Sequence, residues 1–325
     1  MPHEGDSIDP VEKTSKSGIV STECPGNRAY NALLDATYIR ILAPQRMGDL
    51  NSLKSSAPCL KTERQAIERL DQDIKRADKL GAAHDITIDP LTVEPKGTRE
   101  LLPPFTIADS NATVNGETIP EGTTYIKVNH FDHYSQAMQI GDRLMAQNAS
   151  GTSKIDETNS IILDLRDNRG GSIPGLQRMA SLLVGDSNIQ SIGKMSAENL
   201  LQKEDSEIQA YPMNKPYDGV VEKLKDKNII VLTGPETAGG AESLADALRE
   251  KRQAKILGTQ TYGLGSFYVS ERMGYASITY PAGKMFGASG RWLGEGIVPD
   301  IQVDNSQNGQ NRDIQLKAAI DILKK

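Results

Sequence analysis

The chain has 325 residues and a formal net charge of -6 at pH 7, with 25% charged and 37% hydrophobic residues. This balance is ordinary for a soluble protein, and an acidic chain without Lys/Arg runs repels nucleic-acid phosphates. No apolar run approaches the roughly 18 residues that a membrane-spanning helix needs. We therefore expect neither a nucleic-acid partner nor a membrane span.

Residues 1–26 are rich in Ser, Thr, Asp, Glu and Pro and show no hydrophobic periodicity, so we expect a disordered leader. This segment lacks the apolar core of a signal peptide. The sequence as written therefore predicts a cytoplasmic protein, or an exported one if a leader has been removed. Cys24 and Cys59 leave two alternatives open, one disulfide or two unpaired thiols, and their spacing is not that of a metal site.

Two helical patterns predict a small helical lobe over residues 27–81. The first helix is ended by Pro44, and the second stops before Gly81. The apolar faces consist of Leu33, Leu34, Tyr38 and Ile41 in the first helix and of Ile67, Leu70, Ile74 and Ala77 in the second.

Residues 82–325 alternate strand and helix patterns, which predicts a mixed α/β core with some parallel strand pairing. Asn115-Gly116 marks the tip of a hairpin. Residues 189–216 are hard to assign and are expected to form a variable excursion. Strands are expected at 125–128, 160–165, 229–232 and 254–258 and in the segments FYVSE and YASITYP. Helices are expected at 136–147, after Gly171 through Leu183, at 240–248 and around 316–323.

The stretch Asn228–Leu248 is predicted to form a buried strand, a glycine-rich turn and a helix. In α/β enzymes such a turn carries a nucleophile or an oxyanion hole, because it exposes backbone N–H groups at a helix N-terminus. Glu242, near the start of this helix, is expected to cap or brace the turn rather than to catalyse a reaction.

Five segments occur in a characteristic order: YIKVNHF, DLRDNRGG, TAGGAE, ILGTQTYG and GEGIVPDIQV. They resemble the signatures of the tail-specific, or C-terminal-processing, serine peptidases, a clan that includes the tricorn core and the nisin-resistance protein. The resemblance covers roughly Leu80 to Lys325 and implies a ClpP/crotonase-like core. About forty residues separate His84 from Tyr125, too few for the PDZ domain of the processing proteases. The layout therefore resembles the nisin-resistance branch.

The resemblance also implies where the reactive groups stand. The family's nucleophilic serine lies three residues before the glutamate of this turn, which places the nucleophile position at Gly239. The second serine of the nisin-resistance type corresponds to Gly240. The lysine that processing proteases carry 25 residues after the serine corresponds to Leu264. The histidine of the nisin-resistance and tricorn branches corresponds to His84.

Gly170 and Gly171 match the family's glycine pair and, with the N–H of Gly240, imply an oxyanion hole. Such a hole needs only backbone donors in fixed positions. Because Gly239 and Leu264 cannot act as nucleophile and base, conventional serine proteolysis is the activity that the sequence supports least.

Several other residues are candidates for the cleft. Arg166 ends a buried strand, where open α/β sheets bind ligands, and could bind a carboxylate or form a structural ion pair. His130 and His133 form an H-x-x-H pattern without an apparent third ligand, so we expect a solvated loop, from which His130 could line the cleft, and neither a metal nor a cofactor. Trp292 and Phe286 would fill the core or line an apolar pocket.

Three functional hypotheses remain. The first is a repurposed enzyme that uses His84 and the oxyanion site for acid/base chemistry on a peptide-like or small carbonyl-containing ligand. The second is a pseudopeptidase that binds peptide C-termini, or an extended peptide added as a strand beside the sheet. The third is a serine-type peptidase that uses a substitute nucleophile, for which Thr237, Ser243 and Ser266 are the candidates.

Overall fold

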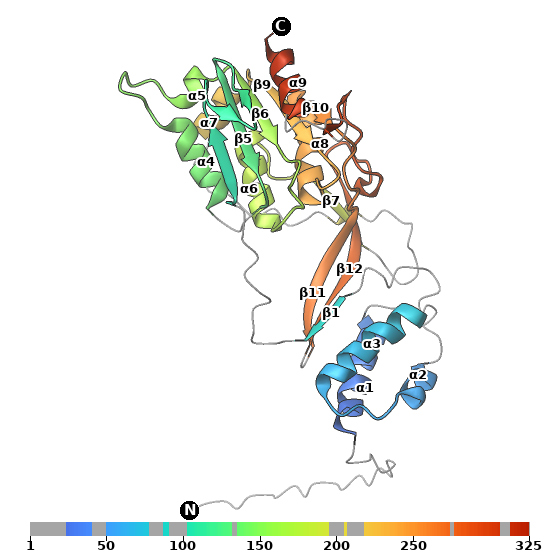
Figure 1. The fold of residues 1–325 in the computed structure, drawn as a ribbon. Coiled ribbons are helices and arrows are strands. Elements are labelled where there is room, and N and C mark those ends of the chain that lie inside the picture. Colours follow the sequence, from blue (N-terminus) through green and yellow to red (C-terminus); the bar gives the residue numbers. More distant parts are fainter. Residues whose placement is uncertain are drawn as a thin grey trace, which may run out of the picture. The chain divides into compact units, whose positions relative to one another are not determined.

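The computed structural model describes residues 24–40, 50–77, 87–90, 103–131, 135–194, 205–206, 218–273, 276–305 and 313–324 (Figure 1). The chain divides into two compact units. The N-terminal unit consists of Met1–Leu91 with Arg272–Ile278, and the second unit, called the core unit below, consists of Thr92–Glu271 with Thr279–Lys325. Most of the expected leader, residues 1–23, lies outside the described residues.

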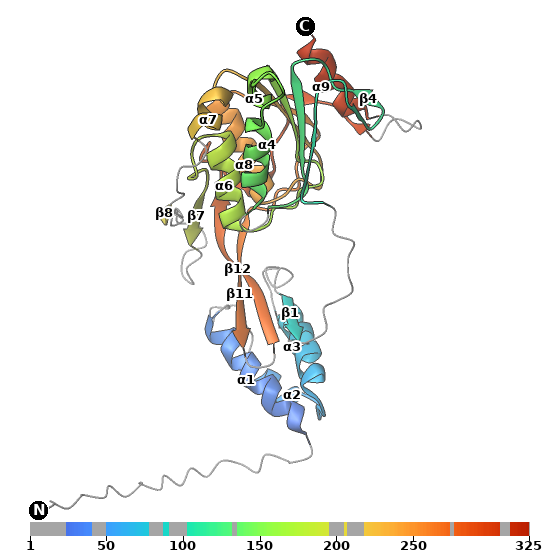
Figure 2. The same cartoon turned by 90° about the vertical axis from the view of Figure 1, so that its left-hand side faces the viewer.

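The residues before Leu91 that the structure describes in the N-terminal unit form three helices and a short strand, of which the second helix was not expected from the sequence. The first and third helices pack against each other through buried Tyr30, Leu34 and Leu70. The hydroxyl of Tyr30 donates to Asp73 Oδ2 at 2.8 Å. The elements are α1 (Pro25–Arg40), α2 (Leu50–Ser56), α3 (Glu63–Ala77) and β1 (Thr87–Pro90) (Figure 2).

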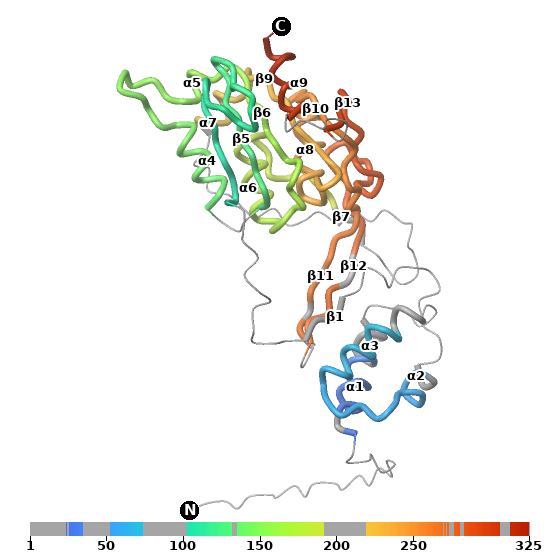
Figure 3. The backbone as a smooth tube through the Cα atoms, viewed as in Figure 1, coloured from blue at the N-terminus to red at the C-terminus, as the bar shows by residue number. Residues whose placement is uncertain are grey.

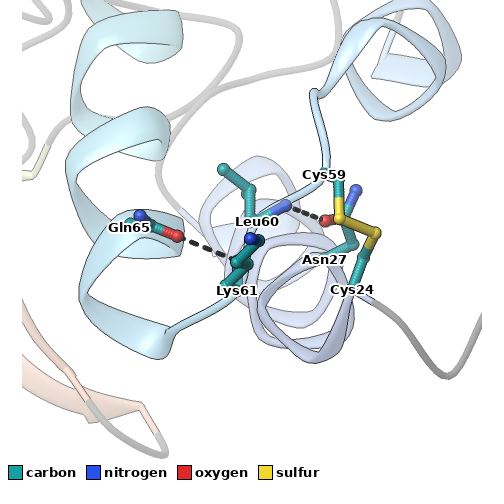
Figure 4. The surroundings of a disulfide bond; sticks show 6 residues. All are labelled: Cys24, Asn27, Cys59, Leu60, Lys61 and Gln65. Atoms are coloured by element: carbon teal, nitrogen blue, oxygen red, sulfur yellow. Dashed lines mark hydrogen bonds between the residues drawn. A yellow bond between two sulfur atoms is a disulfide. The ribbon is translucent and has the colours of Figure 1, made fainter.

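The two cysteines form a disulfide in the N-terminal unit (Figure 4). It joins the residue before α1 to the segment before α3. Next to it, Asn27 Oδ1 accepts a hydrogen bond from the Leu60 N–H at 2.7 Å, and the Gly26 N–H donates to the Leu60 carbonyl at 2.8 Å. A Cβ at Gly26 would lie 2.6 Å from the Thr62 carbonyl oxygen, so only glycine permits this close approach.

A six-stranded mixed sheet forms the centre of the core unit, as the sequence predicts. Its strand order is β13-β10-β9-β6-β5-β2, with parallel pairing throughout except for the antiparallel edge strand β2. The strands are β2 (Phe105–Ala108), β5 (Thr123–Val128), β6 (Ser160–Asp164), β9 (Asn228–Thr233), β10 (Lys255–Gly258) and β13 (Ile301–Gln302).

Helices cover both faces of this sheet (Figure 2). Because side chains alternate along a strand, Val231 packs on one face and Ile230 and Leu232 on the other. The Val231 face carries α4, α6, α7 and α8, and the opposite face carries α9. The helices of the core unit are α4 (Gln136–Met145), α5 (Lys154–Glu157), α6 (Ile173–Leu183), α7 (Asp218–Leu224), α8 (Gly240–Arg252) and α9 (Ile314–Leu323).

Two hairpins complete the fold. The predicted turn at Asn115-Gly116 is present, with φ of 48° and 82°, the left-handed values of a type I′ turn. It joins β3 (Thr113–Val114) to β4 (Glu117–Thr118). A longer hairpin is formed by β11 (Ser266–Met273) and β12 (Ala276–Phe286) (Figure 3). These strands share a sheet with β1, β7 (Ser191–Lys194) and β8 (Asp205–Ser206).

The tip of the long hairpin, Arg272–Ile278, is grouped with the N-terminal unit. Sequence periodicity alone could not reveal this, because the tip begins 195 residues after the end of α3 (Arg272 against Ala77). The predicted boundary between residues 81 and 82 falls outside the described residues and stays a prediction. In the part of the chain that the structure describes, no helix is long and apolar enough to cross a membrane.

The disulfide yields a stability prediction. Replacing both cysteines, Cys24→Ser with Cys59→Ser, should destabilise the N-terminal unit by about 4 kcal/mol, the chain-entropy value for a closed loop of 35 residues. Amide hydrogen exchange of the full chain should then show faster exchange in α1 and α3. The helix α8 in the core unit serves as the internal control and should be unchanged. Unaltered exchange in α1 and α3 would show that the disulfide contributes nothing there.

Candidate functional site

The turn between β9 and α8 is held by a threonine and its neighbours. Thr237 Oγ1 donates to the Leu165 carbonyl at 2.8 Å and accepts from the Gly234 N–H at 3.0 Å. The Thr237 carbonyl accepts from the Tyr262 N–H at 2.9 Å. Because Thr237 is fully buried and both roles of its hydroxyl are occupied, it braces the turn and is poorly suited to act as a nucleophile.

Gly239 stands at the sharpest point of this turn, with φ 56° and ψ -114°. Strand-to-helix turns of this strained kind carry the nucleophile in α/β hydrolases. A Cβ built on Gly239 would lie 3.3 Å from Leu264 Cδ2 and 4.0 Å from Met285 Cε. The positions that the resemblance assigns to the serine and to the lysine are therefore neighbours in space. Neither glycine nor leucine carries a reactive group.

Glu242 connects this turn to the loop that carries Leu264. Its fully buried carboxylate accepts hydrogen bonds from the N–H groups of Gly239 at 2.7 Å, Gly263 at 2.7 Å and Leu264 at 2.9 Å. The Thr261 hydroxyl is a fourth donor. Burial raises the pKa of the Glu242 carboxyl, whereas the four hydrogen bonds oppose that shift. Glu242 thus braces the site, as expected from the sequence.

The backbone donors of the proposed oxyanion hole come from two loops. The Gly170 N–H is occupied, because it donates to Asn168 Oδ1 at 2.8 Å. Among the described residues, neither the Gly171 N–H nor the Gly240 N–H is assigned an acceptor. A Cβ on Gly170 would lie 3.2 Å from the Gly240 nitrogen. Gly171 and Gly240 are therefore the two donors left for a ligand, and Gly170 provides the space beside Gly240.

Asn168 holds these two loops together; the sequence places it at the end of a buried strand, where open α/β sheets bind ligands, but does not indicate this bracing role. Besides binding the Gly170 N–H through its side chain, it accepts from the Ala238 N–H through its carbonyl at 2.9 Å. A side-chain oxygen bound to the N–H two residues ahead is an Asx-turn, and Asn-x-Gly is the sequence signal that could have indicated it.

The walls around the glycines are apolar. A Cβ on Gly240 would meet Leu176 Cδ2 at 3.3 Å and the ring of Phe131 at 3.4 Å. Phe131 also pairs with the glycine loop, since its N–H donates to the Gly170 carbonyl at 2.9 Å. Together with Leu264 and Met285, these side chains give a site whose polar groups are mainly backbone.

Arg166 is engaged in a buried ion-pair network, which favours the structural alternative over a role in binding a ligand carboxylate. Its guanidinium bonds Asp164 at 2.6 and 2.9 Å and Asp313 at 2.6 and 2.7 Å. Asp313 also accepts from the Leu316 N–H at 3.0 Å and so caps α9. Burial opposes ionisation of Asp313, but the hydrogen bonds from Arg166 outweigh it and hold the pKa of that carboxyl well below its usual value of 3.8.

The structure does not place all the remaining candidate residues at the turn between β9 and α8. Ser243 is fully buried and donates to Gln190 Oε1 at 2.7 Å. Ser266 begins β11 and is half-buried. The His130 carbonyl accepts from Gln136 Nε2 at 2.8 Å, and its side chain is half-buried. His84 and His133 lie outside the described residues. Within the described ranges, no three His, Cys, Asp or Glu side chains are grouped to hold a metal.

Trp292 does not fill the core, which was one of the two places expected for it. Its side chain is 38% exposed. Its Nε1–H donates to the Gly265 carbonyl at 3.0 Å, and Lys284 Nζ lies 4.8 Å from the ring centroid. Phe286 is half-buried and forms an isolated antiparallel bridge with Trp292. This aromatic pair closes the loop after β12.

Comparison with known proteins identifies the family. The sequence profile of Peptidase family S41 matches residues 122–303, more than half of the chain. A probable CtpA-like serine protease of Staphylococcus aureus is 25% identical over 181 residues, 55% of this chain and 33% of that protein. The corresponding protein of Staphylococcus epidermidis is 26% identical over 145 residues, 44% of this chain and 27% of that protein. The chain thus spans about a third of the length of these curated relatives.

A solved structure shows the same fold. A lipoprotein from Streptococcus agalactiae superposes with a TM-score of 0.57 over 92% of this chain and 96% of that chain, at 15% sequence identity. At this identity the likeness concerns the fold alone. The profile match shows that the chain belongs to peptidase family S41, with the mixed α/β core that the sequence predicts.

The ion-pair network yields a second stability prediction. Asp313→Asn leaves the Arg166 guanidinium short of a charge partner in a buried site, and should lower the free energy of unfolding by about 3 kcal/mol. Because the pKa of Asp313 is depressed in the folded state, its contribution is complete above pH 3.8 and is lost as the pH falls below that value. Denaturant unfolding at pH 7 and at pH 3 measures both effects, and the variant should lose less stability on acidification.

The control lies on the same helix. Asp321 pairs with Lys317 on the exposed face of α9, where both side chains are 51% exposed. Asp321→Asn should therefore change the unfolding free energy by less than about 0.5 kcal/mol. Equal effects of the two substitutions would contradict a special role for the buried network.

Proposed function

We propose that this member of family S41 binds a peptide-like or small carbonyl-containing ligand through the N–H groups of Gly171 and Gly240, without serine proteolysis. The observation that carries this proposal is the contact between Gly239 and Leu264, at 3.3 Å from the would-be Cβ. This contact occupies the place where a nucleophile and its base would meet. The N–H groups of Gly171 and Gly240 belong to the backbone, so they can bind a ligand whichever side chains stand at positions 239 and 264.

Several features support binding at this place. The donors come from the β6–α6 loop and the start of α8, and a hydrogen bond from the Ala238 N–H to the Asn168 carbonyl ties the two segments together. The first N–H groups of a helix have no partner within the helix and carry a partial positive charge, which favours an acceptor oxygen. Apolar side chains lie against Gly239 and Gly240, and hydrogen bonds made in such low-dielectric surroundings are stronger than in water.

A second candidate function is acid/base chemistry that uses His84. It is favoured by the place of His84 in the sequence, directly after the helical lobe, where related branches carry their histidine. A neutral imidazole there could accept or donate a proton near pH 7. His84→Ala discriminates the two functions: it should leave ligand affinity within a factor of about two if the site only binds, and it should abolish conversion of the ligand if His84 takes part in a reaction. His3→Ala is the matched control.

The proposed binding site predicts how one added methyl group at Gly170 changes the ligand affinity. Gly170→Ala places a Cβ 3.2 Å from the Gly240 nitrogen and covers that donor. Affinity for N-acetylated, C-amidated aliphatic hexapeptides, measured by calorimetry, should fall at least about tenfold, the value of one hydrogen bond with its desolvation. Gly116→Ala is the control, since Gly116 also has a positive φ but has no atom within 4 Å of the would-be Cβ. Unchanged affinity in Gly170→Ala would contradict the proposed site.

A third possibility, residual peptidase activity, is tested by labelling. Thr237 and Ser243 have their hydroxyls engaged inside the protein. A fluorophosphonate probe should therefore label neither of these residues in the native chain. Mass spectrometry that located the label on Ser266 of the native chain would reverse this conclusion.

A further inference from the structure

We infer that the site selects a neutral carbonyl, such as an internal or amidated peptide carbonyl, against a free carboxylate. This inference rests on the proposed function, because it specifies the ligand of the same two donors. A preference for a neutral carbonyl would distinguish this protein from one that binds the free C-terminal carboxylate of a peptide at this turn.

The first argument is the buried charge behind the donors. Glu242 Oε2 lies 2.7 Å from the Gly239 nitrogen, and the next N–H in the chain is the Gly240 donor. A ligand oxygen on Gly240 would be about 3 Å from that nitrogen, and standard bond lengths keep consecutive backbone nitrogens within about 3.7 Å. The oxygen would therefore lie no more than about 9 Å from the Glu242 carboxylate. At an effective dielectric constant of about 20, two negative charges at that distance reduce the affinity by a factor of about twenty, and by more if they are closer. A neutral carbonyl does not meet this repulsion.

The second argument concerns the side chains that the structure places against the turn. The side chains that the structure places against Gly239 and Gly240 are Leu264, Met285, Phe131 and Leu176, all uncharged. The partial positive charge at the N-terminus of α8 is about half an elementary charge. It therefore offsets only part of the charge on Glu242.

Two described cations that lie next to site residues in the sequence have other partners. Arg169 precedes the glycine pair, but it forms an ion pair with Glu236, and the two side chains are 72% and 47% exposed. The charge of Arg169 is therefore balanced by Glu236 and screened by water. Lys284, next to Met285 in β12, lies over the ring of Trp292. Neither supplies the charge that would bind a carboxylate at the two donors.

The third argument is hydration. A carboxylate placed against the apolar walls gives up water that two N–H groups cannot replace, whereas an amide carbonyl gives up much less. Both the field and the desolvation therefore favour the neutral ligand. The aliphatic walls also suit a ligand whose carbonyl is flanked by apolar groups.

The test uses two peptides that differ at one end. An N-acetylated trialanine amide and the corresponding free acid are compared by NMR titration of the full chain at pH 8. The amide should bind at least tenfold more tightly. If the acid binds more tightly, the inference is overturned while the proposed function stands. If neither peptide binds, the proposed function fails, and the inference with it.

One substitution should reverse the selectivity. Leu264→Lys places an ammonium group beside Gly239, so the affinity for the acid should rise at least tenfold while that for the amide stays within a factor of about three. Leu264→Met keeps the volume and the neutral wall and is the matched control, with the preference for the amide unchanged. An acid affinity that does not respond to Leu264→Lys would show that charge at this position does not govern selection.

Discussion

Glu242 is the residue on which the arrangement of the site depends. Its buried carboxylate has no cationic partner among the described residues, and four N–H or O–H donors stabilise it instead. A carboxylate in such a place needs donors in fixed positions, because each lost hydrogen bond leaves a buried charge less satisfied. Consequently the turn at Gly239 and the loop at Leu264 hold each other in place.

This brace holds the turn at Gly239 in its positive-φ conformation. The strained conformation at Gly239 is maintained by its N–H bond to Glu242 and by the close packing of Leu264. Glycine adopts its positive φ without the steric cost that serine would incur. Backbone donors depend on the path of the chain and not on the side chain at position 239, so the proposed role of Gly240 does not require a serine there.

Much of this could be predicted from the sequence, for identifiable reasons. Alternating apolar strands and amphipathic helices predicted the mixed sheet, because burial imposes these periods directly. Counting along the motifs assigned Gly239 to the family's serine position and Leu264 to its lysine position. The structure places the two residues side by side. Two interactions could not be predicted: the hydrogen bond from the Gly170 N–H to the Asn168 side chain, and the ion pair between Arg166 and Asp313. Residue spacing does not indicate which partner a side chain takes, whether that partner is 2 or 147 residues away.

The central claim is that Gly171 and Gly240 donate hydrogen bonds to a ligand carbonyl, and it concerns two amide protons. Their ¹H–¹⁵N resonances, followed during titration with a doubly blocked aliphatic peptide, test it most directly. Both amide protons should shift downfield together and saturate at the same ligand concentration, as expected for two donors to one oxygen. A titration in which the peptide binds but these two resonances do not move would contradict the account.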